Sequence, residues 1–125
     1  MHHRLRGVEM KLERHVGGLS VERKVSYLLK RGWQRQDGGW LSPVPVTDPA
    51  PLKWALHHQL TEDLSAGLAA FGWRVVEYSP RGYARLEDPL RGEHCSLPEA
   101  LRRQARREKR LVRDFTVKLF LAASR

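Results

Sequence analysis

The chain has 125 residues, of which 41% are hydrophobic and four are tryptophan, which is enough for one folded domain without disulfides. Its apolar runs are only a few residues long, so we expect neither a transmembrane helix nor a signal sequence; its single cysteine, Cys95, favours a reducing compartment, the cytoplasm. The net charge of +9 is divided into +5 over residues 1–31, −2 over 32–95 and +6 over 96–125, which favours a polyanionic partner, with a merely soluble arginine-rich surface as the alternative.

The first segment, residues 5–16, fits two patterns. Alternation of Val8, Met10 and Leu12 with charged residues indicates a strand. The apolar positions that start at Leu5 also recur every three to four residues, which indicates a helix instead. We favour the strand and keep the helix as the alternative.

A helix over residues 20–31 is the first clear element. Ser20 is a good N-cap, apolar residues recur at helical spacing, and Gly32 can adopt the left-handed conformation that closes a helix. A glycine-rich turn at residues 37–39 then predicts a β-hairpin whose second strand begins near Trp40.

The second helix has a strong start signal. Asp48 is a suitable N-cap, and Pro49 is favoured at the first helical position. Leucines then recur every four residues, a stripe that rotates around an α-helix by about 40° per step. We therefore expect either a spiralling apolar face or a break near Thr61. The leucines are Leu52, Leu56, Leu60, Leu64 and Leu68.

A second hairpin and a long helix complete the chain. The hairpin is expected to have strands over 73–78 and 83–86, followed by a loop over 88–95. A capping box at residues 96–99, with a proline inside the first turn, starts the last helix. We expect this amphipathic, basic helix to cover 97–123.

The middle of the chain repeats a pattern, which indicates an internal duplication, with a chance match of ordinary capping signals as the alternative. The first copy spans 19–59 and the second 60–104, the second sharing its end with the last helix. In the first copy the repeated residues are Leu28, Gly32, Trp33, Gly39, Trp40, Leu52, Ala55, Leu56 and Gln59. Their counterparts are Leu68, Gly72, Trp73, Gly82, Tyr83, Leu97, Ala100, Leu101 and Gln104.

These elements predict an α+β fold in a single domain, residues 1–125. Two α-β-hairpin units would contribute four strands to one antiparallel sheet packed by helices, with a long C-terminal amphipathic helix.

The predicted last helix carries the strongest functional signal. Advancing about 100° per residue places its apolar side chains on one face and seven cations on the other. Arginine suits phosphate because its planar guanidinium donates two hydrogen bonds at once. This ridge, with Arg4 and Arg6, is the candidate nucleic-acid or anion-binding surface; a solvated face paired with nearby glutamates is the alternative. Its members are Arg102, Arg103, Arg106, Arg107, Lys109, Arg110 and Arg113.

Other residues give weaker signals. Trp40 and Tyr83, at matching positions of the two copies, are the candidates for stacking on bases, although tryptophan is more often a core residue. Val117 and Phe120 project on the basic side of the helix and are candidates for docking a partner or a second copy, with core packing as the alternative. We expect no cofactor, no metal site and no catalytic residue; a thiol hydrolase using Cys95 is the least favoured hypothesis.

Part of the sequence resembles a known group. The run Leu28-x-x-x-Gly32-Trp33, Gly39-Trp40-x-x-Pro43 and Ala55-x-x-x-Gln59 is similar to small proteins of unassigned activity from phage and prophage gene clusters. This resemblance covers about a third of the chain and implies a mobile-element setting without an activity.

A fainter similarity is to HicA-like toxins, whose helix–Gly–aromatic–hairpin unit has a double-stranded-RNA-binding-like fold. Those enzymes carry Gly-Ser-His on the strand after the turn. Here residues 38–41 read Gly-Gly-Trp-Leu, without the histidine, so the resemblance implies no ribonuclease activity.

We therefore expect a small basic non-enzymatic protein of phage type that contacts nucleic acid or a nucleoprotein complex. The alternative is a protein–protein adaptor or inhibitor that binds an acidic host protein. A homodimer through the C-terminal segment is a further expectation, and no membrane partner is expected.

Overall fold

The computed structural model of the protein describes residues 12, 16, 18–43 and 48–124. Leu12 and Val16 are buried in the core, and the rest of the segment predicted as strand or helix lies outside the described residues. The elements in chain order are α2 (Val21–Lys30), β1 (Gln34–Gln36), β2 (Gly39–Leu41), α3 (Leu52–Ala69), β3 (Arg74–Tyr78), β4 (Ala84–Glu87), β5 (His94–Ser96), α4 (Leu97–Arg107) and α5 (Val112–Ala123). This arrangement confirms the predicted α+β class.

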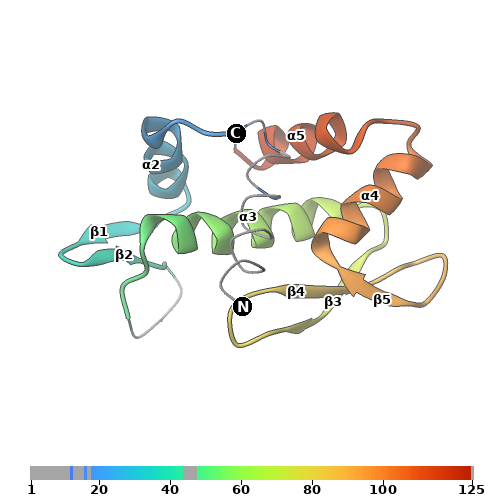
Figure 1. The fold of residues 1–125 in the computed structure, drawn as a ribbon, viewed down its shortest axis with the longest axis horizontal. Coiled ribbons are helices and arrows are strands. Elements are labelled where there is room, and N and C mark those ends of the chain that lie inside the picture. Colours follow the sequence, from blue (N-terminus) through green and yellow to red (C-terminus); the bar gives the residue numbers. More distant parts are fainter. Residues whose placement is uncertain (1–11, 13–15, 17, 44–47, 125) are drawn as a thin grey trace.

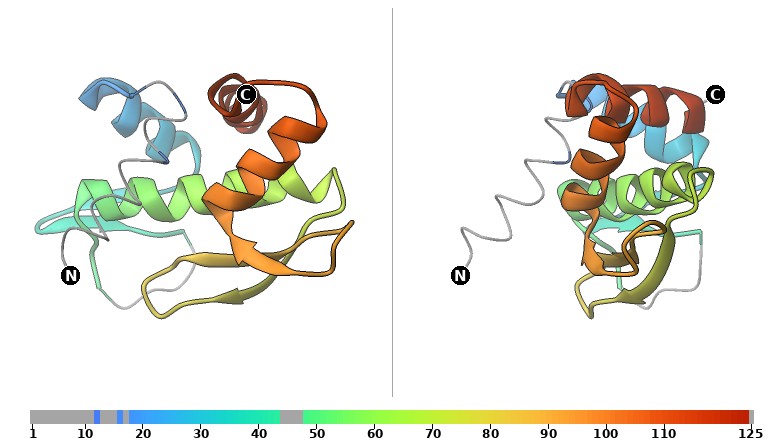
Figure 2. Two further views of the ribbon diagram at one scale, coloured as in Figure 1. Left: turned by 45° about the vertical axis from the view of Figure 1, so that its right-hand side comes forward. Right: turned by 90° about the vertical axis from the view of Figure 1, so that its right-hand side faces the viewer.

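Helix α3 is the central element, and the others pack around it (Figure 1). It runs without a break through Thr61, and the leucine stripe spirals around it. Helix α2 and strand β2 contact α3, and so do β3, α4 and α5 (Figure 2). Ten of its 18 residues are buried. A helix surrounded in this way can be apolar on several sides.

The four predicted hairpin strands form two sheets, which corrects the expected single sheet. Strands β1 and β2 pair as a two-stranded sheet, and β3, β4 and β5 form a three-stranded antiparallel sheet. The outer edge of β2 is already occupied, because the backbone N–H of Trp40 donates to the Ala50 carbonyl at 2.7 Å. The outer edge of β4 pairs with β5. The hairpins therefore cannot join through β2 and β4.

The same pairings explain two smaller corrections. Helix α3 begins at Leu52 rather than next to Pro49, because Ala50 extends the pairing of β2. The predicted loop over 88–95 ends in strand β5, where Cys95 lies opposite Leu86 of β4. A three-residue strand is too short to show an alternating pattern.

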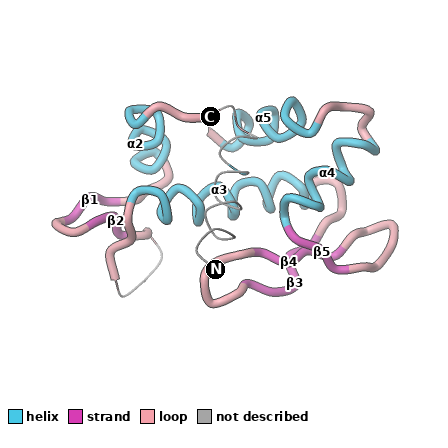
Figure 3. Tube along the Cα trace, viewed as in Figure 1, coloured by secondary structure: helices cyan, strands magenta, loops and turns pink. Residues whose placement is uncertain are grey.

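The predicted single helix over 97–123 consists of two helices, α4 and α5, joined by a loop that Figure 3 shows between them. At the end of α4, Lys109 has a φ of 56°, and the Arg110 N–H donates to the Ala105 carbonyl at 2.9 Å. This left-handed turn reverses the chain, so that α5 returns along α3. Helices α3 and α5 meet at Gly67 of α3, where a Cβ atom would lie 3.0 Å from the Leu119 side chain of α5.

The two copies of the repeated pattern have matching contacts. The Trp33 indole donates to the Gln59 side-chain oxygen at 2.7 Å, and the Trp73 indole donates to that of Gln104 at 2.9 Å. The backbone N–H of each tryptophan also donates to the carbonyl of the repeated leucine, and this hydrogen bond closes the preceding helix. The repeat is therefore present in three dimensions; its origin by duplication stays a prediction.

Candidate functional site

Two arginines of the predicted ridge bind an acid of this chain instead of facing solvent. Asp88 is fully buried, and its carboxylate accepts from the Arg107 guanidinium at 2.7 and 2.9 Å and from Arg103 at 3.0 Å. The hydrogen bond from Arg107, followed by that of the Leu90 backbone N–H, holds the pKa of Asp88 well below its usual range. These two cations compensate a buried charge of this chain, and binding of an external anion by them stays a prediction.

Glu99 binds a third arginine of the ridge. Its two carboxylate oxygens accept from the Nε atoms of Arg102 and Arg103, each at 3.0 Å, three and four residues further along the helix. The side chain of Arg102 remains 41% exposed. Arg102 is thus partly neutralised by an ion pair with a glutamate of the same helix. Such pairing is the alternative to a binding face that the sequence analysis left open.

Four cations of the ridge remain exposed and have no acidic partner among the described residues. They lie at the end of α4, in the loop and in the first turn of α5, and we call them the basic corner. Two acids are adjacent to these cations in sequence. Glu108 accepts from the Gln104 side-chain N–H at 3.2 Å, and Asp114 lies in the first turn of α5. The members of the basic corner are Arg106, Lys109, Arg110 and Arg113.

The backbone of the basic corner is itself suited to anions. Lys109 occupies the left-handed position after a helix where glycine is the usual residue, because a Cβ atom there is disfavoured. Helix α5 then begins without a side chain that caps its first N–H groups. Unsatisfied N–H groups and the positive end of the helix dipole both favour a negative ligand.

The other predicted contact residues lie elsewhere. Trp40 is largely buried, with 6% of its surface exposed, and the Tyr83 ring packs edge-on against His57. Stacking of either ring on a base stays a prediction. Phe120 is buried against Tyr27, with ring centroids 5.0 Å apart, and Val117 is half-buried. The fold places these side chains inside because α5 returns along α3. Arg4 and Arg6 lie outside the described residues.

The groups that could support catalysis or metal binding are not assembled. The described residues contain no cluster of three or more His, Cys, Asp or Glu side chains that could hold a metal ion. The pKa of the half-buried Cys95 thiol is raised, mainly by burial. A raised pKa disfavours the reactive thiolate. Burial, with a smaller contribution from His58, lowers the pKa of His57 to about 4.

Comparison with family models, curated proteins and solved structures finds no match to this chain. No helix in the described part of the chain combines the length and apolar character needed to cross a membrane. Sequence reasoning found the basic ridge but missed Asp88, because a buried acid in a loop has no local signature. The proximity of the ridge to Asp88 depends on the β3–β5 sheet packing beneath α4.

Proposed function

We propose that the protein is a non-enzymatic binding module that contacts the phosphate backbone of nucleic acid through the basic corner. The observation that carries this proposal is the set of four exposed cations within eight residues, none of which forms an ion pair with a described acid. Like charges at this density repel one another unless an anion lies between them. The other ridge arginines position the corner by binding Asp88 and Glu99.

The conformation of Lys109 supports a role for its side chain. A non-glycine residue with left-handed backbone angles costs about 1 kcal/mol relative to glycine. Lys109→Gly is therefore expected to maintain or increase the free energy of unfolding while it weakens nucleic-acid binding. A loss of stability in this variant would instead show that the lysine has a structural role.

The main test is fluorescence anisotropy with labelled random duplex and single-stranded oligonucleotides over a range of salt concentrations. Binding through four phosphate contacts should give a slope of log affinity against log salt of about −4 for duplex DNA. Replacing all four corner cations by glutamine should abolish most of this slope and of the affinity.

The matched control removes the same charge elsewhere. Exposed Arg23, Lys30, Arg81 and Arg85, all outside the corner, are replaced by glutamine. The control should retain most of the affinity. Equal losses in the two variants would mean that net charge alone attracts nucleic acid, and salt-independent binding would reject a phosphate interface. Binding to an acidic protein that persists after nuclease treatment would favour the adaptor alternative.

A further inference from the structure

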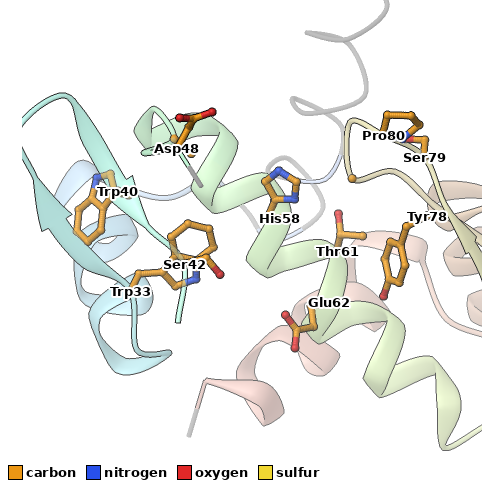
Figure 4. Close-up of a pocket in the computed structure, with 12 residues that line it drawn as sticks. Trp33, Trp40, Ser42, Asp48, His58, Thr61, Glu62, Tyr78, Ser79 and Pro80 are labelled. Carbon is orange, nitrogen blue, oxygen red and sulfur yellow. The ribbon is translucent and has the colours of Figure 1, made fainter. Parts of the chain in front are cut away.

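A cleft of about 560 Å³ opens over α3, between the hairpins of the two copies. Figure 4 shows Trp33 and Trp40 on one side, Tyr78 on the other, and His58, Thr61 and Glu62 projecting from α3 between them. The cleft is therefore formed by both hairpins and by the central helix.

The charge of the cleft is opposite to that of the protein as a whole. Among the residues that the structure describes, its lining includes the carboxylates of Asp48 and Glu62 but no lysine or arginine, although the chain carries a net charge of +9. Burial, and then the negative charge of Glu62, raises the pKa of Tyr78. In Figure 4 these two groups lie at the same end of the cleft.

Thr61 supplies a hydrogen-bonding group without a described partner. The residue is 2% exposed, lines the cleft, and its Oγ1 atom makes no hydrogen bond. Such buried hydroxyls are uncommon, because burial removes their hydrogen bonds to water. A ligand that donates an N–H to Oγ1 would satisfy this atom.

The aromatic wall suits a positively charged ligand. The π face of an indole ring attracts cations. Elsewhere in the same hairpin, the guanidinium carbon of Arg35 lies 5.2 Å from the centroid of the Trp40 ring, so this ring already takes part in such an interaction. Burial lowers the pKa of His58, so its imidazole is neutral at pH 7 and does not repel a cation.

We propose that this cleft binds a small organic cation, a guanidinium or ammonium group on a short apolar stem. The Glu62 carboxylate and the Thr61 hydroxyl accept its N–H groups, and the stem lies against the indole of Trp33. This site is separate from the basic corner and requires a ligand of the opposite charge.

The test uses agmatine as the probe and the side-chain N–H signals of the four tryptophans in two-dimensional ¹H–¹⁵N NMR. Trp33 and Trp40 line the cleft, whereas Trp73, the counterpart of Trp33 in the second copy, does not. Saturable shifts of the first two signals are expected, with a dissociation constant on the order of 1 mM for a ligand of this size. The Trp73 signal should not change.

Two matched ligands test the charge requirement. N-butylurea has a similar shape but is neutral, and butyrate is an anion; both should bind at least about tenfold more weakly than agmatine. Binding of N-butylurea with equal affinity would overturn the proposal. So would the absence of a saturable shift with agmatine at about tenfold above the expected dissociation constant.

Variants identify the groups that bind. Glu62→Gln should weaken agmatine binding about tenfold, whereas Glu77→Gln, an exposed change on β3 outside the cleft, should leave it unchanged. Thr61→Val removes a hydroxyl that stabilises nothing in the free protein, so it should weaken binding without lowering the urea midpoint of unfolding. Unchanged binding in both Glu62→Gln and Thr61→Val would overturn the proposal, as would an equal loss in Glu77→Gln.

Discussion

The two copies of the repeat have the same tryptophan–glutamine pair but different acid interactions. In the first copy, Gln59 donates its second N–H to Asp63 at 3.0 Å, and Asp63 is 2% exposed. Tyr27 and Arg31 of the α2 segment also donate to Asp63, at 2.5 and 2.6 Å. In the second copy, Gln104 donates to Glu108, which is exposed.

The reason lies in the helix that precedes each hairpin. The positions that correspond to Tyr27 and Arg31 are Gly67 and Phe71 in the second copy, and neither side chain can donate a hydrogen bond. Gly67 instead admits Leu119 of α5, and Phe71 packs against Phe115 at 5.6 Å. The first copy thus provides hydrogen-bond donors for a buried acid, whereas the second copy provides the surface on which α5 packs.

The largest expected difference between the copies is in their acids. Asp63→Ala leaves the Tyr27 hydroxyl and a Gln59 N–H without their acceptor, so it should lower the free energy of unfolding by about 3 kcal/mol. Glu108→Ala should change it by less than about 0.5 kcal/mol, because Glu108 is exposed and carries no buried charge. Urea unfolding followed by tryptophan fluorescence measures both, and similar losses would remove the asymmetry.

The glutamines should differ less. Gln59→Leu deprives the buried Trp33 indole of its acceptor and also removes a donor to Asp63, at a cost of about 2 kcal/mol. Gln104→Leu deprives Trp73 in the same way but affects only an exposed glutamate, so about 1 kcal/mol is expected. If Gln104→Leu proves the more destabilising, the first network is not the stronger one.

The copies should also respond to opposite ends of the pH scale. Burial, and then the hydrogen bond to Asp63, raises the pKa of Tyr27. The contribution of Tyr27 to the free energy of unfolding is therefore complete below its unfolded pKa of about 10 and is lost as pH rises through its folded pKa. The lowered pKa of Asp88 gives a contribution present above about pH 4 and lost as pH falls through its folded pKa. Each group should give a slope of about 1.4 kcal/mol per pH unit.

Two variants separate these limbs. Tyr27→Phe should flatten the alkaline limb of stability against pH without changing the acid limb, and Asp88→Asn should do the reverse. Equilibrium unfolding in urea at intervals of half a pH unit provides the profiles. An unchanged alkaline slope in Tyr27→Phe would assign that limb to other groups.

The smallest difference between the copies is expected at the glycines, where their geometry is alike. Gly32 and Gly72 have φ angles of 91° and 94°, and a Cβ atom on either would lie 3.3 or 3.1 Å from the Cβ of Pro43 or Pro89. Alanine should therefore cost about 1 kcal/mol at each position. Thermal unfolding of the two variants should give similar shifts, and a difference larger than the glutamine pair shows would contradict the common geometry.

Much of the fold could be predicted because its signals are local. Ser20 and Ser96 cap their helices through the Arg23 and Glu99 N–H groups, at 3.2 and 3.3 Å, and the glycine turn predicted the first hairpin. A helix end or a turn depends on backbone angles and on neighbours a few residues away. The same reasoning found the run of cations from which the basic corner comes.

The use of those cations was decided only by the tertiary structure. Asp88 reaches Arg103 and Arg107 across 15 and 19 residues of chain, so no periodicity could show that they are paired. The break at Lys109 lacks the glycine or proline that would have marked it, and the cleft requires two separate hairpins to face each other over α3. Composition and spacing determine which groups can interact, but a buried ion pair or a cavity depends on distances that exist only after the elements have packed.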